Sequence, residues 1–202
     1  MKIVFASRNE GKVKEIKNML EGMDIELVSL NNYKNVPEIV EDGKSFLQNA
    51  LKKAKTVSEI TGEIVLADDS GLQVDVLGGE PGIHSARYAG DQAKDEDNNN
   101  KLLAKLKDIP TEKRGAFFCC VLLIYKLDNT YYSFDGKWRG IIIDERRGSN
   151  GFGYDPIFYV PEFKKTAAEL PPEIKNKVSH RGQAFAKLKE SLTEIVNKKI
   201  GA

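Results

Sequence analysis

Carboxylate side chains occur at two places in the sequence where they could hold a metal ion. Asp68 and Asp69 follow a short apolar run, and Glu41 lies in "EDGKSF". Mg²⁺ binds one or two carboxylates together with substrate phosphates. Neighbouring side chains on an extended chain point to opposite faces, so Asp68 and Asp69 need not have the same function. A polar Asp-Ser-Gly turn explains this pair equally well, and Glu41 and Asp42 would also suit a helix start.

A second group of residues is suited to binding phosphate. The segment "SRNEGK" (Ser7–Lys12) stands between a predicted strand and a predicted helix, where free backbone N–H groups favour an anion. Gly11 permits close approach and Lys12 adds positive charge. The spacing is not that of a Walker loop, and Asn9 as a simple helix cap remains an alternative. Taken alone, Lys53 is predicted to be a surface lysine.

Aromatic and donor side chains near the C-terminal end suggest a site for a nucleobase. The stretch "GSNGFGYDPIF" places Phe152, Tyr154 and Asp155 among glycines. Aromatic rings stack on bases, and a carboxylate accepts a base N–H. A glycine-rich turn with two core aromatics is the alternative. Lys175, His180 and Arg181 add donors just before the last predicted helix.

Composition narrows the class of protein. The chain has 202 residues, 41% of them hydrophobic and 30% charged, with a net charge of +1. This balance is ordinary for a soluble domain and indicates neither a nucleic-acid binder nor a membrane-surface protein. The first residues predict a strand rather than a signal peptide. Adjacent Cys119 and Cys120 are poor disulfide partners, which suggests a reducing cytoplasmic location.

Hydrophobic periodicity predicts the elements that carry these residues. Strands are expected at residues 2–7, 25–30 and 63–67, with two long strands within 115–145 joined at Asp128-Asn129. Helices are expected at 9–22, 42–62, 95–109 and 182–199, the last with Phe185, Leu188, Leu192, Ile195 and Val196 facing inward. The pattern predicts an α/β or α+β fold: a mixed β-sheet flanked by helices, with a long hairpin that could form a second lobe.

Six blocks together resemble the inosine/xanthosine triphosphate pyrophosphatase family. They are "ASRNEGK", "EDGKSFLQNALKKA", "ADDSGL", "LGGEPGIHSARYAG", "GFGYDPIF" and "SHRGQA", in the family's order and spacing. The resemblance extends from Phe5 to beyond Gly182. It implies one domain over residues 1–202, with two lobes, a long twisted mixed sheet, and an active-site cleft between the lobes. One departure is His84, where the family commonly has Tyr.

The resemblance also implies roles for individual residues. Glu41 and Asp69 would bind Mg²⁺, with Asp69 also acting on the attacking water as the catalytic residue. Substrate contacts would come from Ser7, Arg8, Asn9, Glu10, Gly11, Lys12, Lys53, Ser70, Phe152, Gly153, Tyr154, Asp155, Lys175, His180 and Arg181. Asp68 would support the site from the other face of its strand. The family's members are usually homodimers.

The implied activity is hydrolysis of deaminated purine nucleoside triphosphates (ITP, dITP, XTP) to the monophosphate and pyrophosphate. Donors such as His180 and Arg181 would pair with the C6 oxygen of the base and oppose the amino group of adenine. Two alternatives remain. One is a pyrophosphatase for modified pyrimidine or ordinary nucleoside triphosphates, and the other is a nucleotide sensor without turnover. The blocks around Phe152 and His180 disfavour the first, and Lys12, Glu41 and Asp69 disfavour the second.

Overall fold

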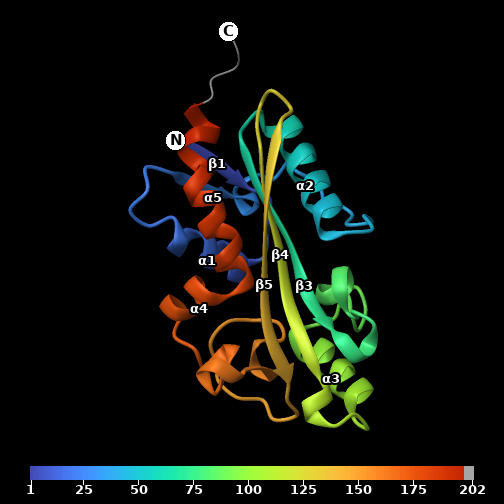
Figure 1. Ribbon diagram of the computed structural model, residues 1–202. Coiled ribbons are helices and arrows are strands. Elements are labelled where there is room, and N and C mark those ends of the chain that lie inside the picture. Colours follow the sequence, from blue (N-terminus) through green and yellow to red (C-terminus); the bar gives the residue numbers. More distant parts are fainter. Residues whose placement is uncertain (198–202) are drawn as a thin grey trace. The chain divides into compact units, whose positions relative to one another are not determined.

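The protein has a mixed α/β fold. The computed structural model describes residues 1–197, with the side chains at 193, 194, 196 and 197 outside the description. The strands are β1 (Lys2–Phe5), β2 (Glu26–Ser29), β3 (Val65–Val74), β4 (Gly115–Tyr125), β5 (Tyr131–Ile142), β6 (Phe158–Val160) and β7 (Lys165–Thr166). The α-helices are α1 (Glu10–Met19), α2 (Phe46–Thr61), α3 (Asp95–Leu106), α4 (Pro172–Val178) and α5 (His180–Asn197) (Figure 1).

The strands form one seven-stranded sheet in the order β2-β1-β3-β4-β5-β6-β7. β1 is parallel to β2 and to β3, whereas β6 is antiparallel to β5 and to β7. The sheet is therefore mixed, as predicted. The predicted turn between the two long strands is also confirmed, because Asn129 there has φ 64°, a conformation that Asn tolerates.

The chain divides into two compact units. The first contains residues 1–69, 120–136 and the segment from Arg181, and the second contains residues 70–119 and 137–180. The boundaries fall between Asp69 and Ser70 and between His180 and Arg181. The candidate site residues are therefore divided between the units.

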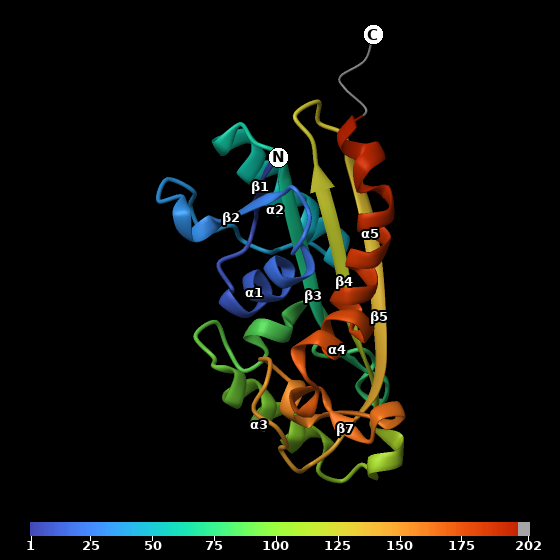
Figure 2. The same cartoon turned by 90° about the vertical axis from the view of Figure 1, so that its left-hand side faces the viewer.

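Each unit has its own apolar core. In the first, the side chains of Phe185, Leu188, Leu192 and Ile195 on α5 join a cluster with residues of β1 and of the start of β5. Figure 2 shows the ribbon of α5 running along β5. This confirms the predicted inner face of α5 for those four residues, while the side chain of Val196 lies outside the described residues. A second cluster packs Ala50, Ala54 and Val57 of α2 against the sheet. In the second unit, Trp138 and Phe158 pack with α3 and β4 residues.

Three predicted boundaries were wrong. β3 runs on through Asp68, Asp69 and Ser70 to Val74, so the two aspartates lie inside a strand rather than in a turn at its end. Helix α2 begins at Phe46, because Ser45 caps it by accepting a hydrogen bond from the Gln48 N–H. Glu41 therefore precedes the helix. His180 and Arg181 begin α5 rather than precede it.

Among residues 1–197, no helix combines the length and hydrophobicity that a membrane span requires.

Candidate active site

The segment Ser7–Lys12 forms the turn from β1 into α1. Asn9 caps the helix, since its Oδ1 accepts a hydrogen bond from the Lys12 N–H at 3.0 Å. Arg8 donates to two backbone carbonyls, those of Leu30 and Val36, at 3.1 and 2.7 Å. Arg8 thus fixes the turn, and the start of α1 presents free backbone N–H groups of the kind that favour an anion. The cap reading of Asn9 is confirmed, and it is compatible with phosphate binding by the neighbouring N–H groups.

Asp68 is the centre of a buried ionic network in the first unit. It is 1% exposed and lies 3.0 Å from Lys12 Nζ and 2.9 Å from Arg181 Nη2. Arg181 also pairs with Glu15 of α1. Burial alone would raise the pKa of Asp68, but Lys12 and Arg181 outweigh it and hold that pKa well below its ordinary value. Asp68 therefore stays ionised and holds Lys12 in place.

Arg181 was expected to contact the base, but its guanidinium already makes hydrogen bonds within the protein. Its guanidinium is 1% exposed and donates to Asp68 and Glu15. These bonds give it a role in linking α5, β3 and α1. Its pairing with the C6 oxygen of a base stays a prediction.

Asp69 faces a different set of side chains, as the alternation of a strand requires. Its Oδ2 accepts a hydrogen bond from Asn49 Nδ2 at 2.9 Å, and its Oδ1 lies 3.7 Å from Lys53 Nζ. Lys53 also pairs with Glu41 at 2.7 Å, so one ammonium group bridges the two carboxylates. Burial raises the pKa of Asp69, and the attraction of Lys53 and Lys12 offsets this only in part.

The charge of Lys53 depends on that bridge. Burial of its ammonium group disfavours the charged form, but Asp69 and Glu41 outweigh this and raise the pKa of Lys53. Lys53 is buried rather than a surface lysine. The alternative weighed from the sequence was therefore wrong.

Asn49 on α2 belongs to this cluster, and sequence reasoning missed it. It is 0% exposed; its Oδ1 accepts the Gly43 N–H at 2.8 Å while its Nδ2 donates to Asp69. A Cβ atom at position 43 would lie 2.5 Å from Asn49 Oδ1, so the close approach requires glycine there. Asn49 thus connects Asp69 to the segment that carries Glu41. The only sequence signal was its place in the "SFLQNALKKA" block.

The donor set of the first unit fits Mg²⁺. Glu41 and Asp69 are the two carboxylates that Mg²⁺ uses when phosphates complete its coordination. Within the described part of the chain, no group of three or more His, Cys, Asp or Glu side chains is arranged to hold a metal alone. Two carboxylates, two lysines and a helix N-terminus are typical of a site for a polyphosphate and a hard cation.

In the second unit, the loop carrying Phe152 is stabilised by a buried ion pair. Asp155 Oδ2 accepts the Phe152 N–H at 2.9 Å and pairs with Lys175 of α4. Lys175 Nζ also lies 5.2 Å from the centre of the Phe152 ring, in cation–π range. Asp155 and Lys175 therefore hold the half-buried Phe152 in position.

Tyr154 and His180 are core residues as well as candidate base contacts. The Tyr154 hydroxyl donates to the Ser85 carbonyl at 2.8 Å, and burial raises the pKa of this tyrosine. The His180 ring stacks on Phe118 with 4.8 Å between centroids. Ser85 belongs to the "LGGEPGIHSARYAG" block, whose chemistry the sequence did not reveal. One function of that block is to anchor Tyr154.

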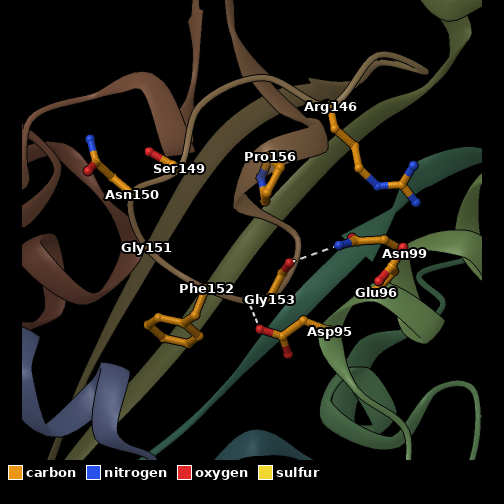
Figure 3. A pocket seen from close by; sticks show the side chains of 10 residues that line it. All are labelled: Asp95, Glu96, Asn99, Arg146, Ser149, Asn150, Gly151, Phe152, Gly153 and Pro156. Atoms are coloured by element: carbon orange, nitrogen blue, oxygen red, sulfur yellow. Dashed lines mark hydrogen bonds between the residues drawn. The ribbon is translucent and has the colours of Figure 1, made fainter.

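His84, the departure from the family pattern, is exposed and borders a cavity of about 430 Å³. A second cavity of about 310 Å³ lies beside the Phe152 loop (Figure 3). Its lining includes Asp95 and Asn99 of α3, together with Arg146.

The predicted site residues are divided between the two units. The first unit contains Ser7, Arg8, Asn9, Glu10, Gly11, Lys12, Glu41, Lys53, Asp69 and Arg181. The second unit contains Ser70, Phe152, Gly153, Tyr154, Asp155, Lys175 and His180. Ser70 lies on β3 directly after Asp69, half-buried.

A mixed sheet that carries carboxylates and lysines beside a helix N-terminus fits the class of enzymes that act on phosphate-bearing substrates. The chain belongs to the Ham1 family, whose model matches residues 3–191. The dITP/XTP pyrophosphatase of Geobacter sulfurreducens is 51% identical over 191 residues, covering 95% of this chain and 96% of the relative. That of Vibrio cholerae is 48% identical, covering 96% and 97%.

Solved structures agree with this assignment. A HAM1 protein from Coxiella burnetii superimposes with a TM-score of 0.86 at 42% identity, covering 96% of this chain and 99% of the other. A nucleoside-triphosphatase / dITP/XTP pyrophosphatase from Mycobacterium abscessus has a TM-score of 0.75 at 46% identity, covering 93% and 98%. The family resemblance and the mixed α/β fold expected from the sequence are confirmed.

Proposed function

We propose that this chain hydrolyses deaminated purine nucleoside triphosphates, namely dITP, XTP and ITP, to the monophosphate and pyrophosphate, with Mg²⁺ as cofactor. The names of its relatives support the substrate class. The observation that carries the reaction is the bridged pair Glu41–Lys53–Asp69 beside the start of α1. This cluster supplies carboxylates for a hard cation and ammonium groups for phosphate oxygens.

The residues of the first unit have separate tasks in this proposal. Bound Mg²⁺ would neutralise charge on the phosphoryl oxygens and on the leaving pyrophosphate. Lys12 and Lys53 bind the phosphate chain, and the N–H groups at the start of α1 donate to it. Asp69 orients the water that attacks the α-phosphorus and accepts its proton.

The second unit would recognise the base. Phe152 offers a ring face for stacking, and its neighbours supply donors and acceptors. A donor such as His180 would pair with the C6 oxygen of hypoxanthine or xanthine. Adenine has an amino group there and would leave the donor unsatisfied, which costs binding energy.

A substrate panel tests this proposal. The protein is incubated with dITP, XTP, ITP, dGTP or ATP and Mg²⁺, and pyrophosphate and orthophosphate are measured separately. We expect pyrophosphate from the first three and little product from dGTP or ATP. Rapid turnover of ATP would favour the alternative of a pyrophosphatase for ordinary nucleoside triphosphates. Binding of dITP without product would favour the alternative of a nucleotide sensor without turnover. Loss of turnover when EDTA removes the metal is the expected result for the cofactor.

The proposal also includes the oligomeric state of the protein and its location in the cell. The family resemblance supports a homodimer, which light scattering of the purified protein tests. Free, buried cysteines Cys119 and Cys120 support a cytoplasmic location.

Replacement of Asn49 by Ala should weaken the metal site. The change leaves the Gly43 N–H and Asp69 Oδ2 without their hydrogen bonds to Asn49, so both carboxylate-bearing segments lose a common support. We expect the Mg²⁺ concentration for half-maximal activity to rise about tenfold, as is typical when a supporting hydrogen bond to a ligand is lost.

Gln48→Ala is the matched control for Asn49→Ala. Gln48 is the adjacent amide and accepts the Lys44 N–H at 2.7 Å, but it makes no hydrogen bond to Asp69. Titrations of activity against Mg²⁺, with calorimetric binding of Mg²⁺ in parallel, compare the two. Equal Mg²⁺ requirements in both variants would contradict the role of Asn49.

A further inference from the structure

Two side chains of α3 bind the backbone of Gly153. Asp95 Oδ2 accepts the Gly153 N–H at 2.6 Å, and Asn99 Nδ2 donates to the Gly153 carbonyl at 3.0 Å (Figure 3). Asp95 and Asn99 are one helical turn apart and thus on the same face of α3. Both polar groups of one peptide residue are held from the same helix. We call this pair the α3 clamp.

The geometry of the α3 clamp is specific. Asn99 is 3% exposed, and its Oδ1 accepts no hydrogen bond from the described residues. Its Nδ2 must face the Gly153 carbonyl, because the opposite amide orientation would put two acceptor oxygens together. Gly153 has φ +63°, which favours glycine. The clamp therefore holds a backbone conformation that few residues would adopt.

The clamp acts on the segment that carries the base-binding candidates. Gly153 lies between Phe152 and Tyr154, and the Phe152 N–H is bonded to Asp155. The loop also borders the cavity of about 310 Å³, so packing supports it only on part of its surface. The hydrogen bonds to α3 therefore hold the loop at a face that the cavity leaves partly unpacked.

The acidic residues at the start of α3 do not all have this role. Asp95, Glu96 and Asp97 are all in the first turn, where any of them suits the helix dipole. Asp97 caps the helix by accepting the Lys94 N–H at 2.9 Å. Glu96 lines the same cavity but makes no hydrogen bond to Gly153 in the described structure. The dipole alone thus does not account for the contact of Asp95.

We propose that Asp95 and Asn99 are positioning residues for base recognition, and that they act by holding the Gly153 peptide and with it the Phe152–Asp155 loop. This inference rests on the proposed function, in which that loop binds the base. It extends recognition to α3, a helix outside the residues expected to contact substrate. It also predicts that the clamp affects nucleoside binding without affecting phosphate binding.

The test uses Asp95→Ala and Asn99→Ala in the full chain, with Asp95→Asn as the conservative variant that keeps an acceptor oxygen. Calorimetry measures binding of dIMP and, separately, of pyrophosphate with Mg²⁺. Loss of one such hydrogen bond should weaken dIMP binding about tenfold and leave pyrophosphate binding unchanged. The kcat/KM for dITP should fall by a similar factor, and Asp95→Asn should recover most of it.

Glu96→Ala is the matched control, because it removes a charge from the same turn and cavity. It should bind dIMP like the parent protein. Hydrogen exchange of the amides at 152–155 should quicken in Asp95→Ala and stay unchanged in Glu96→Ala. Equal weakening of dIMP and pyrophosphate binding, or unchanged exchange at 152–155, would overturn the clamp. Failure of the parent protein to bind dIMP would instead overturn the proposed function.

Discussion

Asp69→Asn should lower kcat for dITP by about 10²–10⁴-fold, the range expected when a positioned proton acceptor is removed. The amide keeps the size of the side chain and an oxygen to accept from Asn49. It cannot accept a proton from water, and it is a weaker ligand for Mg²⁺. The KM for dITP should change much less, because Lys12, Lys53 and the loop around Phe152 remain. Steady-state kinetics at saturating Mg²⁺ measures both constants.

The stability of the same variant provides an independent check. Burial raises the pKa of Asp69, so the folded state favours its neutral form. Its contribution to stability is therefore present at low pH and is lost as pH rises through the folded pKa. At neutral pH, Lys53 keeps its ion pair with Glu41, so Asp69→Asn should shift the urea midpoint much less than Asp68→Asn does. Near-normal turnover, or loss of folding, would contradict the assignment.

Asp68→Asn should have the opposite outcome: a large loss of stability. Removing this carboxylate leaves Lys12 and Arg181 without the buried partner that compensates their charges. Breaking a buried ion pair from one side typically costs about 3–5 kcal/mol. Urea denaturation at neutral pH measures the change in the free energy of unfolding.

The pH dependence of that loss has a definite sign. The folded pKa of Asp68 is depressed, so its contribution to stability is present above the unfolded pKa of about 3.9 and is lost as pH falls further. The difference between Asp68→Asn and the parent should thus shrink in strongly acidic solution. Asp42→Asn is the control, since it breaks an exposed pair with Lys52 and should change stability little. Equal effects of both substitutions would refute the buried network.

The contrast between these neighbours explains why a buried strand carries two adjacent carboxylates. They point to opposite faces of β3, where Asp68 meets Lys12 and Arg181 and Asp69 meets Asn49 and Lys53. Their pKa shifts have opposite directions for that reason. Asp68 belongs to a buried ionic network, and Asp69 is the residue to which we assign the chemistry.

Part of the fold, and the opposite orientations of Asp68 and Asp69, could be predicted from the sequence. Alternation along a strand predicted the opposite faces of Asp68 and Asp69, and apolar periodicity predicted the helices and long strands. The short strands β6 and β7 were not predicted, because strands of two or three residues form through tertiary contacts rather than local preference. The short helix α4 was not predicted either. The continuation of β3 through four polar or small residues likewise depends on the ion pairs around it.

The residues that support the candidate site could not be predicted from the sequence. Asn49, Glu15, Asp95 and Asn99 are amides and acids of ordinary types, and their roles depend on partners distant in the chain. No spacing rule distinguishes them from surface residues. The residues predicted to bind metal or substrate were chosen because they fall in recognisable sequence blocks and because carboxylates and free backbone groups have known chemistry.

The central claim is that water attacks the α-phosphorus of the substrate. Its most direct test is hydrolysis of dITP in oxygen-labelled water, after which the products are separated and their masses are measured by mass spectrometry. Attack of water on the α-phosphorus predicts one labelled oxygen in dIMP and unlabelled pyrophosphate. Label in the pyrophosphate, or release of orthophosphate and dIDP, would contradict the proposed reaction.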